Sequence, residues 1–365
     1  MTETELFSLR VLPEDKQYYE YAKKKWESLA KPIDGLGLLE SAICRIAAIQ
    51  RREDLNMQKS LLIFCADNGV VSEGVSQTDQ GVTAMVAMLM GEQKSSVGIM
   101  LRDTGVDIVP VDIGIACDEK IPGVLDKKIA KGTGNIAKEP AMTKEQCLHA
   151  IETGISLVKE LKEKETGILA TGEMGIGNTT TSTAVLCALC NESPERLTGR
   201  GAGLTDDGLL RKIAVIEKAL ALHELNGRSE RSPEYALRVL TNVGGLDIAG
   251  LTGVFIGGAL FHVPVIIDGL ISATAAYLSE RIVPGTSRYM LASHMGKEQG
   301  CAAVLQKLDL KPLICADLAL GEGSGAILLF PLLDMAESLY RRGTKFTDTA
   351  IRPYERYEND HTDRR

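Results

Sequence analysis

Short apolar runs alternate along the chain with longer segments of helical character. Each run ends near a glycine or an aspartate, which is typical of buried parallel strands that stop at a turn. The runs lie at 61–66, 106–115, 167–170, 263–268 and 313–317. With helices between them, they predict an α/β fold in which helices cover both faces of a parallel, Rossmann-like sheet.

Helical segments fill the intervals between these runs. Thr143 and Gln146 have the spacing of a capping box, so a helix is expected to begin there and to reach about residue 162. Another long helix is expected at 82–102. It contains methionines at positions 85, 88, 90 and 100, and helical spacing of this kind favours packing in the core.

The two ends of the chain predict a second, smaller helical domain. Residues 14–29 form an amphipathic pattern that needs a partner surface, and a long apolar helix is expected to start just after residue 320. We therefore expect an N-terminal helical segment at 1–60 and an α/β catalytic domain at 61–320. A C-terminal helix and tail at 321–365 should return to the small domain.

The composition favours small-molecule chemistry. The chain has 365 residues, of which 44% are hydrophobic, enough for a full core. Its net charge of −8 argues against a nucleic-acid surface, and no apolar stretch is long enough to span a bilayer. The eight cysteines are scattered, and no signal peptide precedes them, so a reducing cytoplasm is expected. Cys187 and Cys190 have redox or zinc spacing, but their apolar helical context favours packing.

A glycine-rich turn at 171–183 is the strongest candidate site. Three glycines expose the backbone after an apolar run, and Asn178 with Thr179 can cap the helix that follows. Free N–H groups and the positive end of a helix dipole favour a phosphate in such a turn. The spacing lacks the last glycine of the dinucleotide pattern and the lysine of the nucleotide-triphosphate loop. We therefore expect a phosphate site of neither common type.

A second glycine-rich turn, at 199–203, precedes a helix that Thr205 or Asp206 can cap. Lys212 falls about two turns into that helix. A lysine there is ordinarily solvated, but it can hold a phosphate or a carboxylate if this turn faces the same pocket.

Acidic residues follow several of the apolar runs. Asp67 and Asp268 each end such a run, so both should lie on one rim of the sheet. Glu322 stands between two glycines near a helix start, where a carboxylate either caps the helix or acts as a base, and the spacing leaves both roles open. His294 has no companion at ligand spacing, which favours a structural role.

Together these motifs closely resemble the family of nicotinate-nucleotide:dimethylbenzimidazole phosphoribosyltransferases. The resemblance runs in order from about residue 30 to residue 350. It is carried by residues 31–40, 66–70 with 73–76, 172–181, 199–203, 268–269 and 321–325. The sequence departs from the family at Asn68, where histidine is common, and at Thr78 and Asp79, where an aromatic residue and proline are common. Both departures lie in the loop that lines the base pocket in the family.

The resemblance implies transfer of the 5-phosphoribosyl group from nicotinate mononucleotide to 5,6-dimethylbenzimidazole or a related base. Inversion at the anomeric carbon would give α-ribazole 5′-phosphate, the lower nucleotide of cobalamin, and nicotinate. By the same resemblance, Glu322 accepts a proton from the base, Glu173 stabilises the positive charge on the ribose, and Lys212 interacts with the negative charge of the substrate. The implied nucleotide-binding residues are Gly175, Gly177, Asn178, Thr179, Thr180, Gly201, Gly203, Asp268, Ser293, Gly321 and Gly323. The implied base-binding residues are Asn68, Ser76, Gln80 and Met85.

The expected partners are the two small-molecule substrates and, by resemblance, a second copy of the chain. The helix at 14–29 is a candidate dimer contact. No cofactor is expected, and no ligand cluster has metal spacing. No nucleic-acid or membrane partner is expected either.

Three other classes of protein share part of this pattern. A dinucleotide-dependent oxidoreductase should show the complete glycine fingerprint with an acidic residue about twenty positions on, which is absent here. A transferase that uses phosphoribosyl pyrophosphate should show an acidic pair before a Thr-rich phosphate loop, whereas Asp206 and Asp207 open a helix. A non-catalytic nucleotide sensor would need neither Glu173 nor Glu322.

Overall fold

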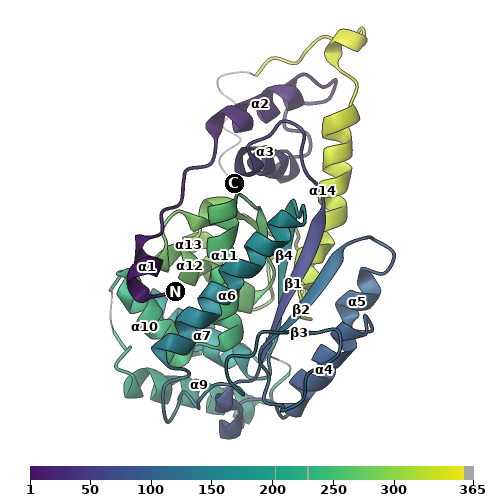
Figure 1. Cartoon of the computed structure of the whole chain (residues 1–365). Coiled ribbons are helices and arrows are strands. Elements are labelled where there is room, and N and C mark those ends of the chain that lie inside the picture. The colour runs from purple at the N-terminus through teal and green to yellow at the C-terminus, as the bar shows by residue number, and fades with distance from the viewer. Residues whose placement is uncertain (202, 228–229, 357–365) are drawn as a thin grey trace.

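A six-stranded parallel sheet forms the centre of the computed structural model, which describes residues 1–201, 203–227 and 230–356 (Figure 1). The strands are β1 (Lys59–Ala66), β2 (Asp107–Gly114), β3 (Leu125–Asp126), β4 (Ile168–Met174), β5 (Val265–Ile267) and β6 (Met290–Ala292). Their order across the sheet is β3-β2-β1-β4-β5-β6, and each neighbouring pair is parallel. The predicted α/β fold class is confirmed.

Side chains of β1 alternate between two hydrophobic cores because successive residues of a strand point to opposite faces. Leu62 and Phe64 join one core, whereas Leu61 and Ile63 join the other. All four side chains are fully buried. β1 is therefore covered on both faces, which explains why its sequence is uninterruptedly apolar.

Helices form a layer on each face of the sheet (Figure 1). One layer contains α6 (Lys144–Glu163), α7 (Asn178–Cys190), α8 (Pro194–Leu197), α9 (Asp206–Leu222), α10 (Pro233–Val243), α11 (Leu246–Phe261), α12 (Leu270–Ile282) and α13 (Gln299–Lys307). The other contains α4 (Gly81–Gly91), α5 (Ser96–Met100) and α14 (Ser324–Arg342). Two predicted helix starts are confirmed, since Thr143 and Gln146 form a capping box and Thr205 caps α9.

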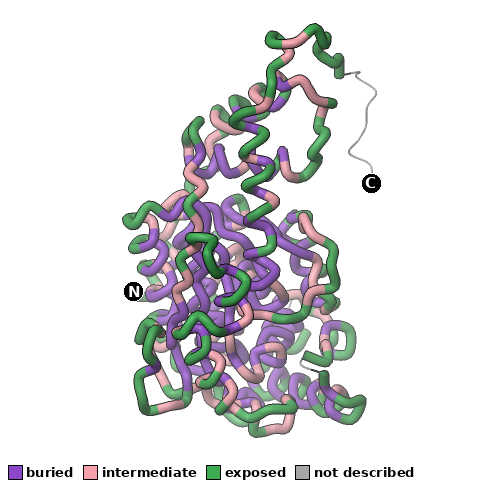
Figure 2. Tube along the Cα trace, turned by 90° about the vertical axis from the view of Figure 1, so that its right-hand side faces the viewer, coloured by how far each residue is buried: buried purple, intermediate pink, exposed green. Residues whose placement is uncertain are grey.

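Beyond the sheet, α2 (Lys16–Glu27) and α3 (Leu38–Gln50) pack beside the far end of α14 (Figure 1). The rings of Trp26 and Tyr340 lie 5.3 Å apart there. The buried trace is concentrated around the sheet, and the trace beyond it is more exposed (Figure 2). The short helix α1 (Glu3–Ser8) instead packs on the α/β part through Leu6. The division into two domains remains a prediction.

The helix predicted at 82–102 is wrong, because the structure divides it into α4 and α5. Gln93 has a left-handed φ of 55° between them, and Ser95 caps the second helix. The expected burial of the methionines is also wrong for three of the four. Met85 is 56% exposed, and Met88 and Met100 are exposed as well, whereas Met90 is buried.

The strand predicted at 313–317 is wrong too. Ile314 forms a single bridge with His294, and residues 315–317 are exposed. Asp317 has a left-handed φ of 49°, which a continuous strand does not allow. The sequence pattern also missed β3 and β6, which are only two and three residues long.

The described residues also form three short 3₁₀ turns: η1 (Gly69–Glu73), η2 (Thr286–Tyr289) and η3 (Phe346–Asp348). Within the described part of the chain, no helix has both the length and the apolar character needed to cross a membrane. The cytoplasmic location therefore remains a prediction.

The helices α6 and α11 cross in direct backbone contact. A Cβ atom at Gly253 would overlap the carbonyl oxygen of Ile151, and one at Gly154 would overlap that of Gly250. Glycine at these positions allows the close approach that seats α11 on the sheet, and α11 carries a residue of the site described below.

We expect Gly253→Ala to destabilise the protein by about 1–3 kcal/mol, because the added methyl group forces the two helices apart. Urea denaturation followed by circular dichroism measures this change. Gly269→Ala is the matched control, since nothing lies within 4 Å of a Cβ atom built at Gly269. Equal stability of the two variants would contradict the close crossing.

Candidate active site

The strand order reverses between β1 and β4, which are neighbours in the sheet although β2 and β3 come between them in the chain. β1 leads to β2 on one side, and β4 leads to β5 on the other. In open α/β sheets a ligand crevice forms at the carboxyl ends of the strands at such a point. The glycine-rich turn predicted as a phosphate site follows β4, so it lies at this position.

The turn from β4 to α7 places two polar side chains in the protein interior. β4 is longer than predicted, so Glu173 lies within the strand and is buried. Gly177 has a left-handed φ of 94° and forms the N-cap of α7, a conformation that favours glycine. The predicted capping of α7 by the Asn178 side chain is wrong. Its amide nitrogen instead donates hydrogen bonds to Glu173 Oε2 and, at 2.9 Å, to Asp247 Oδ2.

The turn that carries Glu322 lies directly against β4. A Cβ atom at Gly172 would lie 2.6 Å from the carbonyl oxygen of Glu322, and one at Gly321 would lie 3.2 Å from Glu173 Oε1. Gly321 and Gly323 both have a φ of 87°, and Glu322 has a φ of 61°. The two carboxylate-bearing segments therefore lie side by side at the same edge of the sheet.

The Glu322 carboxylate faces the start of α5. Its Oε1 accepts a hydrogen bond from Ser96 Oγ at 3.1 Å, and its Oε2 accepts one from the backbone N–H of Val97 at 3.4 Å. Glu322 is half-buried, and it does not cap α14 with its side chain. The contact with Ser96 was missed because the sequence pattern favoured one continuous helix through this region.

Lys212 is buried, although a lysine at this place in a helix is usually solvated. Only 1% of its surface is exposed. Its Nζ donates to Thr179 Oγ1 at 2.8 Å and to the carbonyl oxygen of Gly199 at 3.3 Å. Burial lowers the pKa of Lys212 to about 8, and the charge of Glu298 opposes that effect. This ammonium group is thus held by neutral oxygen atoms, and an incoming anion would stabilise its charge.

Glu173 lies among other acidic groups. Burial, and after it the charge of Asp247, raises the pKa of Glu173 to about 8, although the hydrogen bond from Asn178 acts in the opposite direction. The charges of Asp268 and Glu298 raise it as well. At neutral pH the substrate-free protein therefore holds Glu173 mainly as the neutral acid, and positive charge beside it would favour ionisation.

Asp268 holds the start of α14 in place, and Ser293 is bonded to the end of β5 and to His294. Asp268 Oδ1 accepts a hydrogen bond from the backbone N–H of Ala326 at 3.0 Å, and burial raises the pKa of Asp268 to about 6. Ser293 Oγ donates to the carbonyl oxygen of Ile267 at 2.6 Å and lies 2.9 Å from His294 Nδ1. These bonds are internal to the protein, so nucleotide contacts by Asp268 and Ser293 remain predictions.

The loop after β1 brings Asn68 and Gln80 beside the β4–α7 turn. A Cβ atom at Gly177 would lie 3.2 Å from Asn68 Cβ, and Gln80 Nε2 donates to the Asn68 carbonyl oxygen at 3.0 Å. Asn68 Oδ1 is buried and has no hydrogen-bond partner among the described residues. Ser76 Oγ accepts a bond from the Thr78 backbone N–H at 3.3 Å in the same loop.

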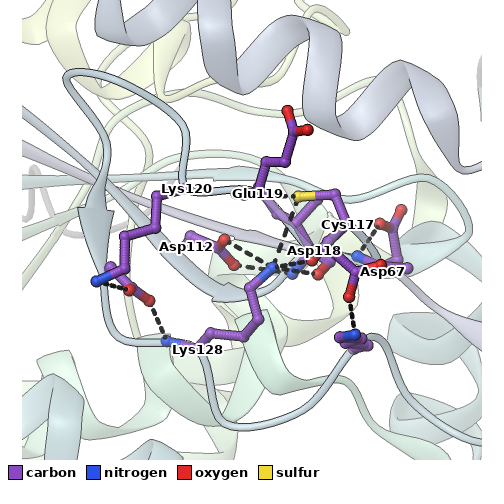
Figure 3. A network of polar contacts seen from close by, with 11 residues as sticks. Asp67, Asp112, Cys117, Asp118, Glu119, Lys120 and Lys128 are labelled. Carbon is purple, nitrogen blue, oxygen red and sulfur yellow. Dashed lines mark hydrogen bonds and ion pairs between the residues drawn. The ribbon is translucent and has the colours of Figure 1, made fainter.

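A second polar network closes the neighbouring end of β2 (Figure 3). Lys128 Nζ lies 3.1 Å from Asp112 Oδ2 and donates to the carbonyl oxygens of Ile115 and Cys117, both at 2.7 Å. Asp67 Oδ2 accepts a hydrogen bond from the backbone N–H of Ala116 at 2.8 Å. These bonds tie the loop after β2 to the ends of β1 and β2, which makes this network part of the scaffold beside the site.

The structure thus brings most of the predicted site residues to one edge of the sheet. One group holds the acids and consists of Glu173, Asn178, Gly321 and Glu322. A second group surrounds the lysine and consists of Thr179, Gly201 and Lys212. Gly203 lies beside the second group and accepts a hydrogen bond from Gln77. Asn178 and Thr179 are consecutive on α7 and join the two groups.

Some predicted residues lie outside these two groups, and one residue of the site was missed. Met85 lies on the exposed side of α4, and Thr180 is buried with no partner for its Oγ1 among the described residues. Asp247, at the start of α11, was not predicted. The one signal for it in the sequence is its place shortly after Gly244-Gly245, which indicates a helix start near a turn. Among the described residues, no three His, Cys, Asp or Glu side chains are arranged to hold a metal ion.

Known proteins share this fold and much of this sequence. A family model described as a phosphoribosyltransferase matches residues 11–351. The nicotinate-nucleotide--dimethylbenzimidazole phosphoribosyltransferase of Ruminiclostridium cellulolyticum is 43% identical over 92% of this chain and 94% of its own length. The protein of the same name from Clostridioides difficile is 37% identical over 95% of this chain and 99% of its own length. The crystal structure of CobT from Thermus thermophilus matches with a TM-score of 0.85 and 32% identity, covering 92% of this chain and 99% of that one.

The fold, the strand-end site and the family model define a phosphoribosyltransferase. More specifically, the chain belongs to the family of nicotinate-nucleotide–dimethylbenzimidazole phosphoribosyltransferases, and the resemblance seen in the sequence is confirmed.

Proposed function

We propose that this enzyme transfers the 5-phosphoribosyl group of nicotinate mononucleotide to 5,6-dimethylbenzimidazole or a closely related base and releases nicotinate. Family membership supports the reaction. The observation that carries the mechanism is the contact between the Glu322 turn and β4, because it puts a half-buried carboxylate beside Glu173 at the strand-order reversal.

In the transfer, one bond from the anomeric carbon breaks and another forms. The bond to the nicotinate ring nitrogen breaks, and its electron pair leaves with the ring, which is already cationic and needs no proton to depart. A nitrogen of the base forms the new bond from the opposite face, which inverts the anomeric carbon. The N–H of the other ring nitrogen then becomes strongly acidic, and its proton passes to Glu322. A carboxylate placed for such a transfer contributes about 10²- to 10⁴-fold in rate.

Glu173 and Lys212 interact with opposite charges of the nucleotide. Positive charge grows on the ribose as the old bond breaks, and an ionised Glu173 beside it stabilises that charge. The substrate phosphate is negative and fits beside Lys212, Thr179 and Gly201, at the start of α7, where the positive end of the helix dipole favours an anion. The two groups of site residues therefore match the two ends of a ribose phosphate.

The base would border the loop that contains Asn68 and Gln80. Asn68 is buried, and its Oδ1 has no hydrogen-bond partner within the described residues. Burial of both faces of a flat ring favours binding in such a place. Ser76 lies in the same loop, and Met85 follows on α4.

We also propose a homodimer, with α4 and α5 at its interface. Met85, Met88 and Leu89 are exposed on α4, and Ile99 and Met100 are exposed on the adjacent α5. Exposed apolar side chains gathered on neighbouring helices are typical of a protein interface. The helix α2 is a weaker candidate than the sequence indicated, because Trp26 is buried within its own chain.

We expect Glu322→Gln to lower kcat by about 10²- to 10⁴-fold, because the amide cannot accept the proton of the base. Affinity for nicotinate mononucleotide and thermal stability should stay near those of the native enzyme. Release of nicotinate, followed by chromatography, measures the rate. Asp317→Asn is the control, since that exposed carboxylate lies on the same loop. A kcat near the native value in Glu322→Gln would remove this residue from the mechanism.

The ratio of the native affinity for nicotinate mononucleotide to that of Lys212→Met should fall by about tenfold between pH 7 and pH 9, because Lys212, with a pKa of about 8, loses its charge over that range. Comparison with Lys212→Met separates this effect from that of Glu173, whose pKa of about 8 lies in the same range. Isothermal calorimetry at the two pH values tests this. Lys212→Met should bind weakly at both, and Lys218→Met, altered at an exposed position of the same helix, should behave like the native protein. The same pH dependence in Lys212→Met would rule out this assignment.

Sedimentation equilibrium should give twice the chain mass of 39.4 kDa. The double variant Met88→Asp with Ile99→Asp should be a monomer with an unchanged circular dichroism spectrum, because charge on the apolar face opposes its burial. Leu210→Asp, at a residue that is 65% exposed on α9, is the control and should remain a dimer. A dimer in the double variant would place the interface elsewhere.

A further inference from the structure

Asp247 is a fully buried carboxylate to which the proposed reaction assigns no role. It is the second residue of α11, with 0% of its surface exposed. Its Oδ1 accepts a hydrogen bond from the backbone N–H of Ile248 at 2.9 Å, which helps to cap its own helix. Such capping alone does not require burial, because most aspartates at helix starts are solvated.

The other oxygen of Asp247 reaches out of its helix to the β4–α7 turn. Oδ2 accepts a hydrogen bond from Asn178 Nδ2 at 2.9 Å, and the same nitrogen donates to Glu173 Oε2. An amide nitrogen carries two hydrogens, so each carboxylate takes one. Both donors of Asn178 are thus committed, and the orientation of the Glu173 carboxyl group is fixed from the far side by Asp247.

Small residues allow this arrangement. A Cβ atom at Gly175 would lie 2.9 Å from Asp247 Oδ2, and one at Gly245 would overlap Asp247 Oδ1 and lie 2.9 Å from Asn68 Oδ1. Asp247 is therefore enclosed between the turn that follows β4, its own helix start and the base loop. A bulkier turn on either side would push the carboxylate away from Asn178.

We propose that Asp247 is a positioning residue, which acts through Asn178 to hold the Glu173 carboxyl group toward the turn of Glu322, where the ribose of the transferred group would lie. The inference rests on the proposed function for the identity of the ribose. The hydrogen-bonded chain from Asp247 to Glu173 is independent of that function.

The pair Glu173 and Asp247 also sets the charge of the site. Burial raises the pKa of Asp247 to about 6, and its negative charge is the second cause, after burial, of the raised pKa of Glu173. The other titratable groups that face the pair are also acidic or neutral. They are Asp67 toward Asp247, the buried thiol of Cys65, and three carboxyl groups toward Glu173, which belong to Asp268, Glu298 and, on the turn before α14, Glu322. Removal of the Asp247 charge should therefore lower the pKa of Glu173.

The test uses Asp247→Asn, which keeps the size of the side chain and removes its charge. We expect the Glu173 carboxyl group, followed by ¹³C NMR in the full-length protein without substrate, to titrate at a lower pH than in the native protein. The alkaline-rising limb of the kcat profile should move to lower pH with it. The KM for nicotinate mononucleotide should change less than kcat, because the phosphate contacts lie at Lys212.

A second variant, Asn178→Ala, removes the bridge from the other side. The double variant combines Asp247→Asn with Asn178→Ala. If Asp247 acts through Asn178, the kcat of the double variant should be no lower than that of Asn178→Ala alone. If the two residues have separate roles, the losses in kcat of the two single variants should add. This variant also serves if Asp247→Asn does not fold. An unchanged Glu173 titration in Asp247→Asn, or additive losses in the double variant, would overturn the proposal. Absence of transferase activity in the native protein would instead overturn the proposed function and leave the NMR result to decide the role of Asp247.

Discussion

A backbone contact between β4 and the turn before α14 is the constraint on which the site depends. At Gly172 the strand and the turn approach so closely that only a residue without a side chain fits. The contact fixes the position of Glu322 on the turn. The left-handed backbone of residues 321–323 directs its carboxylate toward α5. Because β4 is next to β1, the same contact holds this carboxylate at the reversal of strand order.

Around that contact the substrate-free protein holds ionisable groups whose charged forms its interior disfavours. The pKa values of Glu173, Asp247 and Asp268 are raised by burial, and the pKa of Lys212 is lowered by it. A ligand with a cationic sugar centre and an anionic phosphate would stabilise the charged form of both kinds of group at once. The charged forms of these groups are therefore complementary to one class of ligand, and the groups lie beside a scaffold that includes the Asp112–Lys128 pair.

Much of the fold could be predicted from the sequence because local signals agreed with the final packing. The apolar run of β1 and the capping box at Thr143 are examples. The errors arose where distant contacts decide the outcome. Asn178 has the chemistry of a cap, but two buried carboxylates take its hydrogens. The strands β3 and β6 are too short to show a periodicity, and they exist because neighbouring strands pair with them. For the same reason Asp247 was not predicted, since its importance lies in a contact with a residue 69 positions away in the chain.

The helix α14 connects the edge of the sheet that carries Glu322 with the helix α2 at the other end of the molecule. Its first residues follow Glu322 directly, and its last turns pack against Trp26 on α2. With 19 residues it is about 28 Å long, so a tilt of about 5° at one end displaces the other by about 2 Å. A shift of that size exceeds the tolerance of a hydrogen bond to a reacting base. The aromatic packing at the far end of the helix therefore contributes to the alignment of the Glu322 carboxylate at its start.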